Sequence, residues 1–148
     1  MKLTKVGAGA TVALTLMATA AFAGLRQPAP VAVDLDAQFA SGDLITAADA
    51  KNDEVFIGCG TRNFDDGVGG VFRFAFCQAA DAEGDRVVCN TSNPELVQTI
   101  REINDSGYIQ FSWTDDGAGN LTCSATGFST QSFYADKHSK GNQKGNER

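Results

Sequence analysis

The chain has 148 residues and a formal net charge of −6 at pH 7, with 18 acidic residues against 12 basic ones. An acidic surface repels phosphate backbones and anionic lipid, so the composition argues against nucleic-acid binding and membrane-surface binding. The length predicts one domain that is large enough to bury a hydrophobic core.

The first 23 residues predict an export signal. Lys2 and Lys5 form a short positive segment, an apolar, Ala-rich stretch follows, and Ala21-Phe22-Ala23 offers the small-x-small pattern that signal peptidase reads. The apolar stretch is shorter than the about 20 residues that a membrane span needs, although an uncleaved anchor is the alternative. We expect a mature chain that starts at Gly24, is secreted or periplasmic, and has no stable membrane anchor.

Residues 24–54 predict an extended arm followed by a short helix. Two prolines precede an alternation that is typical of an added strand, formed by Val31, Val33 and Leu35. The short helix is predicted near residues 44–51.

Residues 55–134 predict an α+β domain with about five strands in a mainly antiparallel sheet and one helix packed on one face. The strands are expected at 55–61, 71–79, 85–91, 108–113 and 121–128, where apolar residues alternate between turns. The helix should begin after Asn93, a good N-cap, with Pro94 in its first position. Its apolar stripe consists of Leu96, Val97, Ile100 and Ile103, which we expect to lie across a sheet face of Phe, Ile and Trp side chains. Residues 135–148 predict a disordered basic tail.

A turn about Glu83 sets a register for the two strands beside it. This register places Cys77 opposite Cys89. One face should then carry Phe72, Phe74, Phe76 and Val88, and the other Ala75, Cys77, Val87 and Cys89.

The four cysteines predict two structural disulfides, because an even number in an exported chain is typical of an oxidising compartment. They are Cys59, Cys77, Cys89 and Cys123, and no C-x-x-C pair of the kind that binds metal or exchanges thiols is present. Four cysteines allow three pairings. The register favours Cys77 with Cys89, which leaves Cys59 for Cys123.

Catalytic residues are hard to find in the sequence, and we expect none. The single histidine, His138, lies in the predicted tail, where no fold would hold it as a base. Asp65-Asp66 and Asp115-Asp116 could form the paired carboxylates of a hydrolase, but adjacent aspartates before glycine are also ordinary turn chemistry.

The run "DDGAGN" is a weak calcium candidate. Asp115, Asp116 and Asn120 could supply oxygen ligands around permissive glycines, although no glutamate closes an EF-hand. A plain hairpin turn is the alternative. We expect no other metal site and no cofactor.

The spacing of the motifs in the second half of the chain resembles that of a group of small secreted bacterial proteins of unassigned function. The resemblance covers roughly residues 70–125: Cys77, an Asp/Gly turn, "VVCNTSNPELV", "YIQFSW", a loop and Cys123. It implies the fold and the export route, and it passes on no activity.

The sequence therefore favours an exported, non-catalytic binding or inhibitory domain. The partner is expected to be a macromolecule, either a basic protein surface or a second copy of the chain. The alternatives are an assembly subunit that uses the arm at residues 24–36, and a small carboxylate-dependent hydrolase.

Overall fold

The computed structural model describes residues 25–135. The predicted export signal, its cleavage site and the predicted tail from residue 136 onward lie outside these residues. In the described part, no helix is long and apolar enough to cross a membrane.

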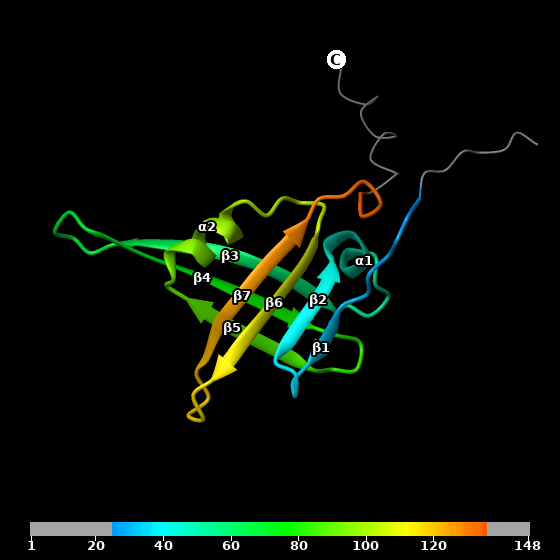
Figure 1. The fold of residues 1–148 in the computed structure, drawn as a ribbon, viewed down its shortest axis with the longest axis horizontal. Helices are drawn as coiled ribbons and strands as arrows, with labels where there is room; N and C mark the ends of the chain where they lie inside the picture. The colour runs from blue at the N-terminus through cyan, green and yellow to red at the C-terminus, as the bar shows by residue number, and fades with distance from the viewer. Residues whose placement is uncertain (1–24, 136–148) are drawn as a thin grey trace, which may run out of the picture.

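Seven strands form a single sheet in the order β1-β2-β6-β7-β5-β4-β3 (Figure 1). The strands are β1 (Ala32–Asp34), β2 (Phe39–Asp43), β3 (Phe56–Asp65), β4 (Val71–Ala80), β5 (Arg86–Thr91), β6 (Tyr108–Asp115) and β7 (Leu121–Ser129). Neighbouring strands are antiparallel except β5 and β7. The predicted class is confirmed in its coarse form, a mainly antiparallel sheet with few helices and two disulfides.

The predicted number of about five strands is wrong. The arm supplies one additional strand, β1, and the segment after it supplies another, β2. The sequence of β2, "FASGD", hides this strand because it lacks the alternation of apolar and polar residues by which half-buried strands are recognised. Pairing with β6 on one side and β1 on the other holds it in place.

The sheet curls around one concave face. In Figure 1, β2, β6 and β7 cross β3, β4 and β5 at a steep angle. Because of this curl, β1 at one edge of the sheet lies beside the loop between β4 and β5, close to the other edge. There the N–H of Val33 donates to the carboxylate of Asp81 at 3.1 Å. The concave face holds the core.

The predicted faces of β4 and β5 are confirmed. Cys77 lies opposite Cys89, and the face that carries Ala75, Cys77, Val87 and Cys89 is buried together with Ile109, Phe111 and Trp113 of β6. The Phe face of β4 is on the outside of the sheet, with Phe72 exposed and Phe74 and Phe76 half-buried. Val97 and Ile100 of the predicted helix are buried in the same cluster as Ile109, Phe111 and Trp113, whereas the phenylalanines of β4 lie on the other face of the sheet.

Two helices close the core, and both contact β3. The first, α1 (Leu44–Ala48), lies where the short helix is predicted, and Asp43 caps it. The second, α2 (Pro94–Arg101), begins as predicted, because the side chain of Asn93 accepts from the N–H groups of Glu95 and Leu96. Val97 and Ile100 are its buried residues.

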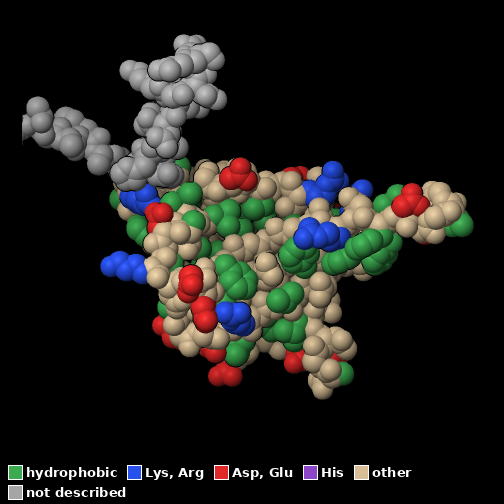
Figure 2. Space-filling view, turned by 180° about the vertical axis from the view of Figure 1, so that it is seen from behind, with side chains coloured by type: hydrophobic (Ala, Val, Ile, Leu, Met, Phe, Trp, Pro, Cys, Tyr) green, Lys and Arg blue, Asp and Glu red, His purple; other side chains and the backbone are tan. Residues whose placement is uncertain are grey.

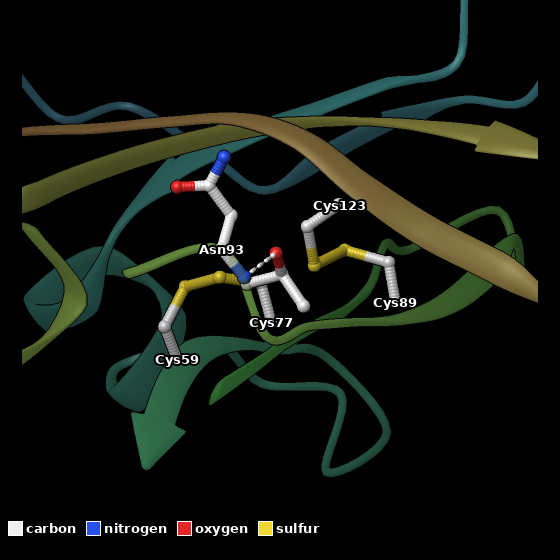
Figure 3. The surroundings of a disulfide bond; sticks show 6 residues. Cys59, Cys77, Cys89, Asn93 and Cys123 are labelled. Atoms are coloured by element: carbon white, nitrogen blue, oxygen red, sulfur yellow. Dashed lines mark hydrogen bonds between the residues drawn. A yellow bond between two sulfur atoms is a disulfide. The ribbon is translucent and has the colours of Figure 1, made fainter. Parts of the chain in front are cut away.

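The two disulfides join Cys59 to Cys77 and Cys89 to Cys123 (Figure 3). The predicted pairing of Cys77 with Cys89 is therefore wrong, although the register on which it rests is right. The four cysteines occupy the neighbouring strands β3, β4, β5 and β7. A bond between the middle two would leave the outer two three strand spacings apart, about 14 Å, which is too far for a disulfide.

Candidate protein-binding surface

The two Asp-Asp pairs lie at the tips of two separate hairpins that share one loop design. In the β3–β4 loop, Asp66 Oδ1 accepts from the N–H groups of Val68 (2.9 Å) and Gly70 (2.8 Å). In the β6–β7 loop, Asp116 Oδ1 accepts from Ala118 (2.8 Å) and Asn120 (3.1 Å). Positive φ angles at Gly67, Gly69, Gly117 and Gly119 make the repeated loop shape accessible.

These hydrogen bonds lower the pKa of both central aspartates. For Asp66 the largest cause is the N–H of Val68, and for Asp116 it is the side chain of Asn120. The other oxygen of Asp116, Oδ2, accepts from Asn120 Nδ2 at 2.8 Å, so both oxygens serve the loop itself. The contacts of the calcium candidates Asp116 and Asn120 are those of a self-supporting turn. Asp115 Oδ1 accepts from the N–H of Gly117 at 2.8 Å.

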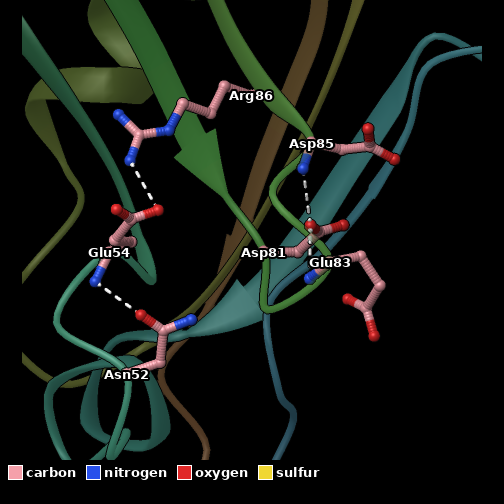
Figure 4. Close-up of polar contacts among 6 residues, drawn as sticks. All are labelled: Asn52, Glu54, Asp81, Glu83, Asp85 and Arg86. Atoms are coloured by element: carbon pink, nitrogen blue, oxygen red, sulfur yellow. Dashed lines mark hydrogen bonds and ion pairs between the residues drawn. The ribbon is translucent and has the colours of Figure 1, made fainter.

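A third loop, between β4 and β5, uses the same contacts around a buried carboxylate. Asp81 Oδ1 accepts from the N–H groups of Glu83 (3.1 Å) and Asp85 (2.9 Å) (Figure 4). Its other oxygen takes the bond from Val33 of β1. Asp81 lines a hollow of about 580 Å³ along β1, together with Asp34, Glu83 and Asp85. Sequence reasoning did not identify Asp81 as a buried anchor of the arm.

A second buried aspartate anchors the beginning of the arm. Asp43 is 1% exposed. One of its oxygens caps α1 by accepting from the N–H of Thr46 at 2.7 Å, and the other accepts from the N–H of Ala29 at 2.6 Å. The arm is therefore an integral part of the domain, with Val31 and Val33 in the core.

The end of the β3–β4 hairpin projects beyond the rest of the sheet (Figure 1). The pairing of β5 with β4 ends where Thr91 faces Ala75, whereas β3 and β4 remain paired out to Asp65 and Val71. We call residues 62–74 the ribbon. Sequence reasoning assigned most of it, Arg62 to Gly70, to a loop. The available signal was the alternation of Val71 to Cys77, because it begins before Ala75, the residue at which pairing across the turn with β5 ends.

Large apolar side chains gather on the ribbon. Among the seven exposed large hydrophobic residues of the described chain, four lie here: Phe64 (53% exposed), Val68 (89%), Val71 (64%) and Phe72 (59%). Figure 2 shows the apolar patch over the projecting hairpin, with basic side chains beside it. Phe64 and Phe72 are paired across the two strands on the outer face, whereas Val71 lies on the other face and Val68 in the loop at the tip. Scattered exposed apolar residues are normal, but paired exposed rings of this kind are typical of an interaction site.

The phenylalanine rings of the ribbon form an ordered outer face. Phe64 and Phe74 stack with ring centroids 5.9 Å apart and planes at 5°, and Phe72 packs against Phe74 at 6.1 Å. Beside them lies a hollow of about 420 Å³ lined by Phe72, Phe74, Asn90, Thr91, Ser92 and Thr122. No charged side chain lines this hollow.

The ribbon carries two arginines, Arg62 on the outer face with the rings and Arg73 on the opposite face. The guanidinium of Arg62 lies 4.8 Å from the ring centroid of Phe76, and Arg73 Nε donates to Asn63 Oδ1 at 2.7 Å. The residues from 25 to 135 carry 16 acidic side chains and only six basic ones. Two of these six basic side chains, Arg62 and Arg73, are in the ribbon. Exposed aromatics with an arginine beside them, as Arg62 is here, are the residues that interface cores favour.

Metal-ligating side chains and comparisons with known proteins do not point to another site in the described residues. The described residues contain no group of three or more His, Cys, Asp or Glu side chains that could hold a metal ion. No family model, no curated protein and no solved structure matches the chain.

Proposed function

We propose that this protein is an exported, non-catalytic binding domain that contacts a protein partner through the outer face of the ribbon. The observation that carries the proposal is the exposure of Phe64 and Phe72 on an ordered stack of rings. Burying rings of this kind against a partner removes a large apolar area from water and supplies the main part of the binding free energy.

The ribbon on its own has low stability and a tendency to aggregate, and contact with a partner would remove both disadvantages. A hairpin of two strands with no further support is marginally stable in water, and exposed apolar residues favour aggregation. In this protein the disulfide between Cys59 and Cys77 crosses the hairpin between the body and the ribbon. It holds the two strands together at the base of the ribbon and so preorganises the aromatic face.

The charge of the domain favours a protein over a nucleic acid or an anionic membrane. The described residues have a formal charge of −10. A partner with a basic rim around an apolar centre fits this surface, and the attraction between the charges weakens as salt screens them.

The two disulfides indicate an oxidising compartment. We propose that the protein reaches it as a secreted or periplasmic chain that begins at Gly24. Mass spectrometry of the exported protein tests this, because a chain that still begins at Met1 in the membrane fraction would contradict it.

The binding proposal is tested with the mature chain as bait in the exported fraction of the producing cell. The retained protein is purified, and its dissociation constant is measured for the wild type and for Phe72→Ser. We expect Phe72→Ser to weaken binding about 10-fold or more, as removal of a hot-spot aromatic does. The matched control is Leu35→Ser, which removes an apolar side chain that is 49% exposed outside the ribbon. Equal affinities for Phe72→Ser and the wild type would refute the ribbon as the binding face.

The other two functions have less support. An assembly subunit that donates its arm would have to withdraw Val31 and Val33 from its own core and break the contacts of Asp43 and Asp81. A carboxylate-dependent hydrolase would use Asp66 or Asp116, whose oxygens already accept bonds from their own loops.

A further inference from the structure

The free edge of β3 has a defined set of unpaired backbone groups. β3 is the last strand of the sheet, and its hairpin with β4 closes with a bond from the N–H of Asp66 to the C=O of Gly70 at 3.1 Å. Ladder bonds in an antiparallel pair fall on alternate residues. The even-numbered residues of β3 therefore bond to β4, and the odd-numbered ones, Thr61, Asn63 and Asp65, direct their N–H and C=O groups away from it.

One side chain covers part of this edge. Arg62 Nη1 donates to the C=O of Thr61 at 3.0 Å. Further along β3, the described contacts give the backbone groups of Asn63 and Asp65 no partner outside the sheet. An open strand edge of this kind is a template on which another strand can pair.

We propose that a second copy of the chain pairs with this edge, β3 against β3, about a two-fold axis at Asn63. Asn63 then faces Asn63 of the second copy, and Thr61 faces Asp65. On the outer face, Arg62 faces Phe64 of the second copy and can leave the Thr61 carbonyl for that ring. A register centred at Asn63 confines the pairing to the part of β3 that projects beyond the body, away from the helices that contact the strand.

A second copy fits this edge because the edge is self-complementary about a two-fold axis and the ribbon itself is neutral. The ribbon holds two basic residues, Arg62 and Arg73, and two acidic ones, Asp65 and Asp66, so two ribbons can meet without net repulsion. The remaining described residues of each copy carry the whole charge of −10 and repel those of the other. Antiparallel pairing of the ribbons places the two bodies at opposite ends of the pair, which keeps these like charges apart.

Pairing also removes the structural weakness of the ribbon. Two strands become four, which is enough for a stable sheet. Because the axis is perpendicular to the sheet, the outer faces of both copies form one continuous aromatic face. This inference concerns the edge of β3 and does not depend on the outer face binding another protein.

The experiment measures the mass of the mature chain by light scattering and sedimentation over a range of concentrations. We expect the mass to rise from one chain to two with concentration, and the dimer to strengthen as salt screens the repulsion between the bodies. A dissociation constant of about 1 mM marks a very weak complex. If the mass stays that of one chain at every concentration up to this value, the proposal is overturned.

Two variants of Asn63 distinguish the contribution of its backbone N–H at the strand edge from that of its side chain. Asn63→Pro removes an N–H that faces the free edge, a position where proline is tolerated in edge strands. Asn63→Ala keeps this N–H and loses only the side-chain contact with Arg73. We expect a single-chain mass for the proline variant and a two-chain mass for the alanine variant. A proline variant that dimerises like the wild type would overturn the proposal.

Hydrogen exchange of the wild type gives a test that needs no substitution. The amides of Thr61, Asn63 and Asp65 should exchange more slowly at high concentration, whereas the exposed amide of Val68 at the tip should not change. Protection that is independent of concentration at all three amides would contradict strand pairing even if a dimer forms.

Discussion

Cys77 on β4 and Cys89 on β5 lie directly opposite each other, yet each is bonded to the cysteine on its other side, Cys59 and Cys123 respectively. The two bonds therefore join β3 to β4 and β5 to β7. The second bond crosses the single parallel contact of the sheet, where only Asn90 and Thr122 are paired. It reinforces the junction with the fewest backbone pairings.

Loss of the two disulfides should have unequal effects on stability. The Cys89–Cys123 bond closes 34 residues and the Cys59–Cys77 bond 18, which correspond to about 4 and about 3 kcal/mol in the chain-entropy model. Cys89 and Cys123 are also both buried. We expect Cys89→Ala/Cys123→Ala to lower the free energy of unfolding more than Cys59→Ala/Cys77→Ala, measured by urea denaturation. A peptide map that links Cys77 to Cys89 would contradict the structure itself.

Asp43 should be one of the most sensitive polar positions. In Asp43→Asn, one acceptor oxygen becomes an amide donor that faces the N–H of either Ala29 or Thr46. A buried donor left without a partner costs about 1–3 kcal/mol, so we expect a loss of unfolding free energy in this range. Asp34→Asn is the matched control, because Asp34 makes one similar bond, to the N–H of Ala37, in an exposed turn. Equal stabilities of the two variants would show that Asp43 does not hold the arm.

The hairpin tips should respond to acid at unusually low pH. The pKa values of Asp66 and Asp116 lie below the ordinary 3.8, because loop donors favour the charged carboxylates. A carboxyl whose pKa is lowered by folding stabilises the loop above pH 3.8, and this contribution is lost as the pH falls through the lower value. We expect the amide resonances of Val68 and Ala118 to stay constant down to pH 4 and to move only below it.

Asp116→Asn supplies an internal control for this titration. It should abolish the acid shift at Ala118 and leave the shift at Val68 unchanged, because the two loops lie on separate hairpins. Movement of both amides between pH 4 and 6 would show that the loop donors do not hold these carboxylates in their charged form.

A charge in the buried stripe of α2 should destabilise the domain strongly. Ile100 is 4% exposed, and Ile100→Asp would bury a carboxylate without a partner. We expect a loss of about 4 kcal/mol in the free energy of unfolding, measured by thermal and urea denaturation. Gln98→Asp places the same charge on the exposed side of the helix, where repulsion from Glu102 costs only about 0.5 kcal/mol. A melting temperature of Ile100→Asp within error of the wild type would show that Ile100 is not a core residue.

The sequence by itself determined the features that depend on neighbours along the chain. Asn93 and Pro94 mark the start of α2 because capping is a matter of a few adjacent residues. The turn around Glu83 placed Cys77 opposite Cys89 because a short hairpin fixes its own register. The two Asp-Asp-Gly segments form turns because their carboxylates reach their own backbone N–H groups.

Only the tertiary structure decided the features that depend on which strands become neighbours. The order of β3, β4, β5 and β7 selects the disulfide pairing, and no short segment of sequence encodes that order. β2 becomes a strand because β6 offers an edge to pair with, and the arm, whose alternation already predicts a strand, is placed in the sheet by β2, Asp43 and Asp81. The projecting ribbon follows from the same long-range pairing. β5 ends at Thr91 while β3 continues, and the rings of Phe64 and Phe72 are left in water because no other element of the described chain covers them.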